Sequence, residues 1–157
     1  MESKEFKKAF CEMAKQFGFK TAFGCCYKQS TECLFVLELQ KSYYSNLYYL
    51  NMKTYIQGTF GKEYTIHKDY LKKDMGNIFG RPTKPYASIF DLEADMSDEA
   101  RLALLNAFFH DYMSRYAEKN LTVAGIRELA ELKELYLIDN VENELNRLYP
   151  VDARMGK

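Results

Sequence analysis

Residues 33–57 of the chain, CLFVLELQKSYYSNLYYLNMKTYIQ, decide its fold. Aromatic and aliphatic residues alternate with polar ones through much of this stretch, and a period of two is typical of β-strands. The spacer 43–46 is short enough for a hairpin loop. We therefore expect two antiparallel strands, over 33–42 and 47–57, joined by that loop.

The register of this hairpin separates a core face from a polar face. If the loop closes from Ser42 to Leu47, the numbers of paired residues add up to 89, and Leu39 lies opposite Leu50 on the core face. Clustered tyrosines often mark recognition surfaces, so the polar face is the candidate binding site. The alternative is a face that simply meets water, with an ordinary diagonal pair of charges. The candidate residues are Glu38, Gln40, Tyr49, Asn51, Lys53 and Tyr55.

A helix and further strands are expected around this hairpin. Apolar residues recur at helical spacing from Phe6 to Phe17, Ser3 is a reasonable N-cap, and Gly18 ends the helix. Additional strands are expected over 19–28, 63–67 and 87–92, with a loop over most of 69–85 that includes a short apolar piece at 78–79.

The chain is expected to be helical from residue 97 to 149. Its strongest pattern is an apolar stripe centred on Phe109, with Arg101 outside it. Thr122 can cap a shorter helix, and Asp139 starts a capping-box pattern before the last one. The stripe consists of Leu102, Leu105, Phe108, Phe109, Tyr112, Met113 and Tyr116.

The length of 157 residues fits one domain with one core, which we take to span 1–157. We predict an α+β fold in which an antiparallel meander of three to five strands packs against the N-terminal helix and the C-terminal helices.

Motifs for several chemistries are missing from the sequence. No GxxxxGK[ST], GxGxxG, HExxH or GxSxG pattern occurs. The four cysteines lack metal-ligand spacing, so we expect free thiols, no metal and no cofactor.

Two His–Asp pairs are the candidates for catalysis. His67 and Asp69 could touch if they lie on a strand, whereas His110 and Asp111 are helical neighbours that cannot easily pair. A single pair without a placed nucleophile is weak support for catalysis, so an enzyme is disfavoured.

Charge is balanced overall but unevenly distributed. Residues up to Pro85 include 14 basic and 8 acidic side chains, and the rest include 8 and 14. We expect the two halves to pack together so that their charges partly cancel; the alternative is a charge dipole that faces a partner. A net charge of zero disfavours a nucleic-acid partner.

Met1–Lys8 does not resemble the start of a signal peptide, and the longest strongly apolar run, 33–37, is far shorter than a membrane span. We expect a cytoplasmic protein without membrane contact.

Several segments resemble the family of domains of unknown function called DUF4304. After the N-terminal helix, the resemblance is carried by Gly18-Phe19-Lys20, Leu37-Glu-Leu-Gln-Lys-Ser42 and Tyr48-Tyr-Leu-Asn51, and further along by Phe79-Gly-Arg-Pro82 and Ile89-Phe-Asp-Leu-Glu93. It covers about residues 1–95. This chain has Ile89 and Phe90 where the family commonly has tryptophan. The resemblance implies the same α+β fold and a cytosolic location, and it implies no particular activity.

Two functional hypotheses follow. The first is a non-enzymatic module that binds an unknown protein or peptide partner, for example an immunity-like protein that blocks a toxin. Its acidic C-terminal half would then suit a basic partner. The second is a small-ligand-binding protein or an enzyme with a pocket between the sheet and residues 76–85, where Arg81 contacts an anion. A flat, open, tyrosine-rich face favours the first hypothesis. A closed pocket that holds His67, Arg81 and carboxylates with perturbed pKa values favours the second.

Overall fold

The sheet is an antiparallel meander of five strands in the order β1-β2-β3-β4-β5. The computed structural model describes residues 1–151. β3 and β4 pair in the register expected from the alternation, with Leu39 opposite Leu50 and Gln40 opposite Tyr49. The expected fold class is therefore confirmed. The strands are β1 (Lys20–Ala22), β2 (Cys25–Gln29), β3 (Cys33–Lys41), β4 (Tyr48–Ile56) and β5 (Ile78–Gly80).

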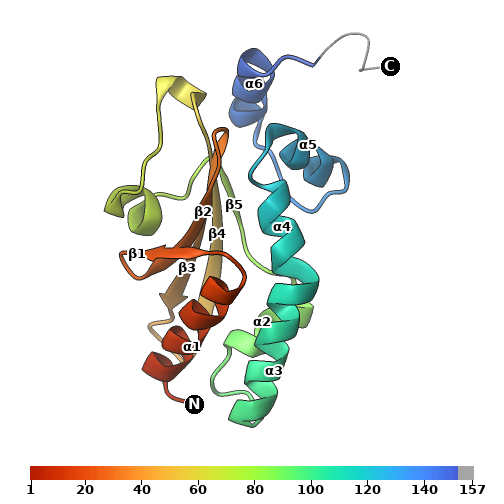
Figure 1. The fold of residues 1–157 in the computed structure, drawn as a ribbon. Helices are drawn as coiled ribbons and strands as arrows, with labels where there is room; N and C mark the ends of the chain where they lie inside the picture. The colour runs from red at the N-terminus through yellow and green to blue at the C-terminus, as the bar shows by residue number, and fades with distance from the viewer. Residues whose placement is uncertain (152–157) are drawn as a thin grey trace.

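Helices cover one face of the sheet. α1 (Ser3–Gln16) lies on it beside a long helix, which consists of α3 (Asp98–Phe108), the π-helical turn η3 (Phe109–Met113) and α4 (Ser114–Lys119) (Figure 1). Phe109 is fully buried at the centre of this layer, and its ring centroid lies 5.3 Å from that of Phe10 on α1. The apolar stripe of the sequence therefore builds the main core.

The opposite face of the sheet is covered at one end. The connection between β4 and β5 includes η1 (Thr59–Gly61) and η2 (Asp69–Lys73), and Figure 1 shows it on the side of the sheet away from α3. Leu71 and Tyr64 from this connection pack against Val36 and Tyr55. Coverage on both faces explains why β3 begins with an uninterrupted apolar run instead of an alternating one.

Two short helices close the end of the sheet. α5 (Val123–Glu131) begins as predicted, with the Thr122 hydroxyl accepting a hydrogen bond from the Gly125 backbone N–H at 2.9 Å. α6 (Asp139–Leu148) has no capping box, because Asp139 is already helical and Ile138 holds the N-cap position. The two helices pack on the ends of β3, β4 and β5 through Cys33, Ile56 and Ile78. Within residues 1–151, no helix combines the length and the apolar character needed to cross a membrane.

The strand expected over 19–28 is wrong as a single element. Phe23 and Gly24 both have positive φ angles, +52° and +76°, so the chain reverses there and Ala22 pairs with Cys25. Such two-residue hairpins need positive φ at both central positions, and glycine adopts it without strain. Gly24, within the dipeptide Phe23-Gly24, was the signal in the sequence for this turn.

The two other short strands expected from the sequence are also wrong. Residues 63–67 form no strand, and most of 87–92 belongs to the helix α2 (Lys84–Phe90). Pro85 stands in its first turn, where proline is well tolerated. Ile89 and Phe90 are buried while Tyr86 is partly buried, which is a helical spacing that the alternation obscured.

Two polar residues take positions that the sequence did not indicate. Arg101 was expected outside the apolar stripe, but its side chain is buried, and its Nη1 donates to the carbonyls of Ser88, Ile89 and Asp91. It therefore satisfies carbonyls at the C-terminus of α2. Ser3 does not cap α1, and its hydroxyl instead lies 2.6 Å from that of Tyr48.

Candidate functional site

The open end of the polar sheet face forms a cleft of about 610 Å³, which we call the Arg81 cleft. It lies beside β3 and β4 and is bounded by the segment from η2 to the residue after β5. Gln40 and Tyr49 are exposed here, whereas Tyr55 is buried under the β4–β5 connection. Burial raises the pKa of the Tyr55 hydroxyl. The cleft is lined by Glu38, Gln40, Tyr43, Asn51, Lys53, Lys72, Lys73, Asp74, Met75, Phe79 and Arg81.

The position of Arg81 follows from the pairing of β5 with β4. Lys53 lies opposite Phe79, so the residue after β5 reaches the level of Asn51. Gly76 lets the chain approach β4 before β5 begins, because an added Cβ there would lie 3.1 Å from the Thr54 carbonyl oxygen, and its φ is +80°.

The Arg81 guanidinium lies over two aromatic rings. Its central carbon lies 4.5 Å from the ring centroid of Tyr49 and 5.6 Å from that of Phe79. Its Nε donates to the Asn51 side-chain oxygen at 3.0 Å. Stacking on aromatic faces stabilises a guanidinium and limits its motion. Arg81 is therefore oriented although its side chain remains exposed.

Asn51 orients Arg81 because its own amide is fixed. Its nitrogen donates to Glu38 at 3.2 Å and to Gln40 at 2.9 Å, which leaves its oxygen to accept from Arg81. Only 4% of Asn51 is exposed. Glu38 in turn pairs with Lys53. Arg81 is therefore connected by polar contacts to four residues that the sequence predicted: Asn51, Gln40, Glu38 and Lys53.

The floor of the cleft is a buried ion pair. Lys53 Nζ lies 2.8 Å from Glu38 Oε1, and the two side chains are only 2% and 15% exposed. Lys53 also donates to the Leu71 carbonyl at 3.0 Å. A face that merely meets water would leave this pair solvated, so that alternative does not describe the Lys53 end of the sheet.

The cleft carries an excess of positive charge. Lys53, Lys72, Lys73 and Arg81 line it, against the carboxylates Glu38 and Asp74. Lys53 is neutralised by Glu38, and Lys73 lies 3.3 Å from Asp69. Among residues 1–151, no carboxylate lies within ion-pair distance of Arg81. The two terminal nitrogens of the guanidinium therefore have no anionic partner in the part of the chain that the structure describes.

Exposed apolar side chains surround the cleft. Tyr43 and Tyr44, in the β3–β4 turn, are 94% and 98% exposed, and Met75 is 62% exposed. Met75 and Phe79 are not candidates from the sequence, because their approach to this face depends on the β4–β5 pairing. The apolar pair at 78–79 next to a glycine was the available signal for that pairing.

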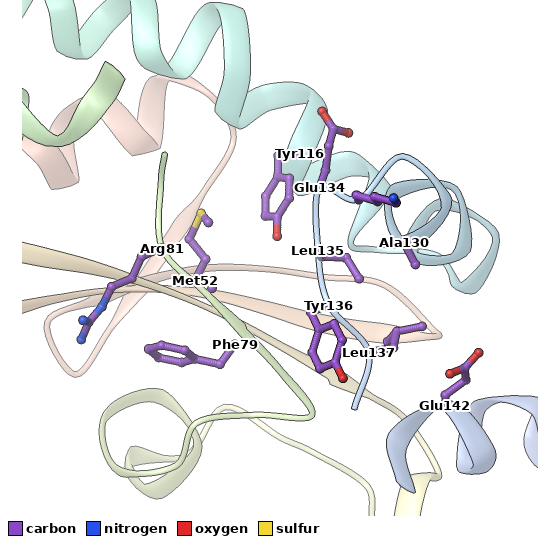
Figure 2. A pocket seen from close by; sticks show the side chains of 12 residues that line it. Met52, Phe79, Arg81, Tyr116, Ala130, Glu134, Leu135, Tyr136, Leu137 and Glu142 are labelled. Carbon is purple, nitrogen blue, oxygen red and sulfur yellow. The ribbon is translucent and has the colours of Figure 1, made fainter. Parts of the chain in front are cut away.

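A second cleft, of about 650 Å³, lies on the other side of Arg81. It separates β5 from the segment that joins α5 to α6, and Figure 2 shows Phe79 and Tyr136 lining it from these two segments. In the same view the Arg81 guanidinium points away from Tyr116 and Met52. Arg81 thus lies at the border of this cleft and directs its charge toward the polar sheet face.

Neither histidine lies in the Arg81 cleft. His67 lies 3.7 Å from Asp69 and both side chains are exposed, but the strand on which they were expected to share a face does not form, and Asp69 instead begins η2. His110 and Asp111 do pair, at 2.7 Å, although they are adjacent in the π-helical turn, so that expectation is wrong. Among residues 1–151, no group of three or more His, Cys, Asp or Glu side chains could hold a metal ion.

Comparisons with known proteins give one match. A family model described as "Domain of unknown function (DUF4304)" matches residues 10–119, which extend from α1 through α4 and include the Arg81 cleft. No curated protein and no solved structure matches the chain.

Proposed function

The chain belongs to the DUF4304 family, and we propose that it is a non-enzymatic binding module whose Arg81 cleft holds a carboxylate-bearing peptide segment of a partner protein. The observation that carries the proposal is an oriented guanidinium that has no carboxylate partner among residues 1–151.

The geometry of Arg81 suits a carboxylate. Its Nε–H already donates to Asn51, and the two terminal nitrogens remain to donate to the two oxygens of a carboxylate in a bidentate pair. Because Tyr49 and Phe79 already hold the guanidinium, little side-chain entropy is lost when the ligand binds. The neighbouring Gln40 amide and Lys72 ammonium supply further donors for the same ligand.

The surroundings of the cleft favour a peptide as the bearer of that carboxylate. Tyr43, Tyr44 and Met75 extend an apolar, exposed surface beyond the cleft itself. Tyrosine, arginine and methionine are enriched at protein interfaces, and tyrosine and arginine often contribute most of the binding energy. A peptide can lie along this surface while one of its acidic side chains pairs with Arg81.

The charge pattern supports an acidic partner segment over a basic one. Several C-terminal carboxylates already have internal partners: Glu134 pairs with Arg115, and Glu128 with Lys119. Of the ion pairs within residues 1–151, two join the basic N-terminal half of the chain to its acidic C-terminal half. They are the pairs of Met1 with Asp98 and of Lys28 with Glu118. If the module is immunity-like, the toxin would present an acidic segment to the Arg81 cleft.

A free small carboxylate is the second candidate ligand. The cleft volume of about 610 Å³ lies within the usual range of small-molecule sites, about 300–1,000 Å³. The chemistry at Arg81 would be the same, so the two candidates differ in the size of the ligand.

Peptide selection tests the proposal. A library of displayed random peptides is selected on immobilised wild-type protein and counter-selected on Arg81→Gln, with Arg147→Gln as control because Arg147 already pairs with Glu144. We expect enriched peptides to carry Asp or Glu, and their affinity to fall at least about tenfold in Arg81→Gln, as for a typical hot spot. Arg147→Gln should bind like wild type.

Two outcomes would contradict the peptide proposal. Peptides that lack acidic residues and bind Arg81→Gln equally well would remove Arg81 from the site. Thermal stabilisation by malate or citrate that Arg81→Gln abolishes, in a protein that selects no acidic peptide, would support the small carboxylate instead.

A further inference from the structure

Two cysteines from different elements meet beside the main core. Cys11 lies on α1 and Cys26 on β2, and their sulfur atoms are 3.8 Å apart, with the Cys26 thiol directed at Cys11. A disulfide bond is about 2.05 Å long, so side-chain rotation and a small approach of α1 would join them. Cys25 faces the other side of the sheet, where its sulfur lies 3.5 Å from the Leu71 carbonyl oxygen. It therefore cannot replace Cys26.

The two thiols differ in access. Cys11 is partly exposed, whereas Cys26 is 1% exposed. A dissolved oxidant can reach Cys11 first, and Cys26 is then the thiol in place to react with the product. This is the arrangement of an attacking cysteine beside a resolving cysteine.

The surroundings of Cys11 favour its thiolate. The hydrogen bond from Cys26 lowers the pKa of Cys11 to about 7, and Lys7 and Lys15 contribute to the lowering while burial opposes it. These lysines lie four residues before and after Cys11, on the same side of α1. In contrast, burial raises the pKa of Cys25 to about 11 and that of Cys33 to about 12. Those two thiols serve as internal controls.

We propose that Cys11 and Cys26 form a reversible oxidation site for hydroperoxides. The Cys11 thiolate attacks one oxygen of hydrogen peroxide, the O–O bond breaks, and Cys11 becomes a sulfenic acid as hydroxide leaves. The Cys26 sulfur then attacks the Cys11 sulfur, the S–O bond breaks, and the Cys26 proton leaves with the hydroxyl group as water. Overall, two thiols and one peroxide give one disulfide and two waters. An added dithiol then reduces the disulfide to two thiols and is itself oxidised to a disulfide.

Intact-protein mass spectrometry after treatment with hydrogen peroxide tests this proposal. We expect wild type to lose two hydrogens, to regain them with dithiothreitol, and to give a cross-linked peptide that contains Cys11 and Cys26. Cys26→Ser should stop at the sulfenic acid, which dimedone traps on Cys11. Cys11→Ser should show neither product, while Cys25→Ser and Cys33→Ser should behave like wild type.

Several results would overturn the proposal. They are a peroxide-treated wild type without a disulfide, a disulfide that involves Cys25 or Cys33, or dimedone labelling that persists in Cys11→Ser. Because Cys26 is buried, Cys26→Ala provides a second resolving-cysteine variant, and circular dichroism spectra establish that each variant is folded. None of these cysteines lines the Arg81 cleft, so this test is independent of the proposed binding function.

Discussion

Replacing Lys53 by methionine is expected to destabilise the protein by about 3–5 kcal/mol, because the change leaves the largely covered Glu38 carboxylate without its cation. The pair is short, 2.8 Å, and its side chains are 2% and 15% exposed. Solvent-exposed ion pairs contribute only about 0–1 kcal/mol. The Leu71 carbonyl also loses a hydrogen-bond donor, which contributes about 1 kcal/mol of this loss.

A double variant separates the charge effect from the loss of packing. In Lys53→Met with Glu38→Gln, no buried charge remains and the glutamine oxygen can still accept from Asn51. We therefore expect the double variant to be only about 1–2 kcal/mol less stable than wild type, mainly through the hydrogen bond lost at Leu71. Lys73→Met is the matched control, because its pair with Asp69 is exposed. It should cost no more than about 1 kcal/mol.

Urea denaturation followed by far-UV circular dichroism measures these differences, since the chain has no tryptophan for fluorescence. Equally small losses of stability in Lys53→Met and Lys73→Met would contradict a desolvated ion pair at Lys53. Such a result would mean that water reaches the floor of the cleft, and that Glu38 does not help to hold Asn51 and Arg81 in place.

Three further predictions follow. Phe109→Ala should destabilise the protein by about 3–5 kcal/mol, since Phe109 is fully buried, and Arg115→Ala should cost far less; equal small effects in urea melts would contradict this core. Arg101→Met should cost about 3 kcal/mol or more, because buried carbonyls lose their donor, and a wild-type midpoint would contradict that role. Alkylation of Cys11 should be half-maximal near pH 7 and increase as the thiolate forms above it; a profile centred near the ordinary cysteine pKa of about 8.5 would contradict the lowered pKa.

The sequence predicted best where the pattern was long and local. β3 and β4 are nine residues each and alternate around a short loop, so one register buries the core residues and the observed pairing follows. The apolar stripe around Phe109 was equally clear because it extends over several helical turns.

The sequence predicted least where contacts join distant segments. β5 has only three residues, and its pairing with β4 depends on the path of a long connection, so neither Phe79 nor Met75 could be placed beside Asn51. Arg101 resembles a surface residue in any helical pattern, and its burial follows from the α2 carbonyls that surround it. Arg81 was expected to contact an anion, but the side chains that orient it appear only in three dimensions.

The Nε–H resonance of Arg81 gives the most direct test of carboxylate recognition. Its hydrogen bond to Asn51 should slow proton exchange and make this signal observable by NMR, with Arg81→Lys for assignment. The probes are N-acetylglutamate amide and its uncharged match, N-acetylglutamine amide. We predict a saturable shift of the Arg81 signal with the glutamate derivative and little or no shift with the glutamine derivative. Equal shifts with both compounds, or a glutamate effect spread evenly over all arginine signals, would contradict it.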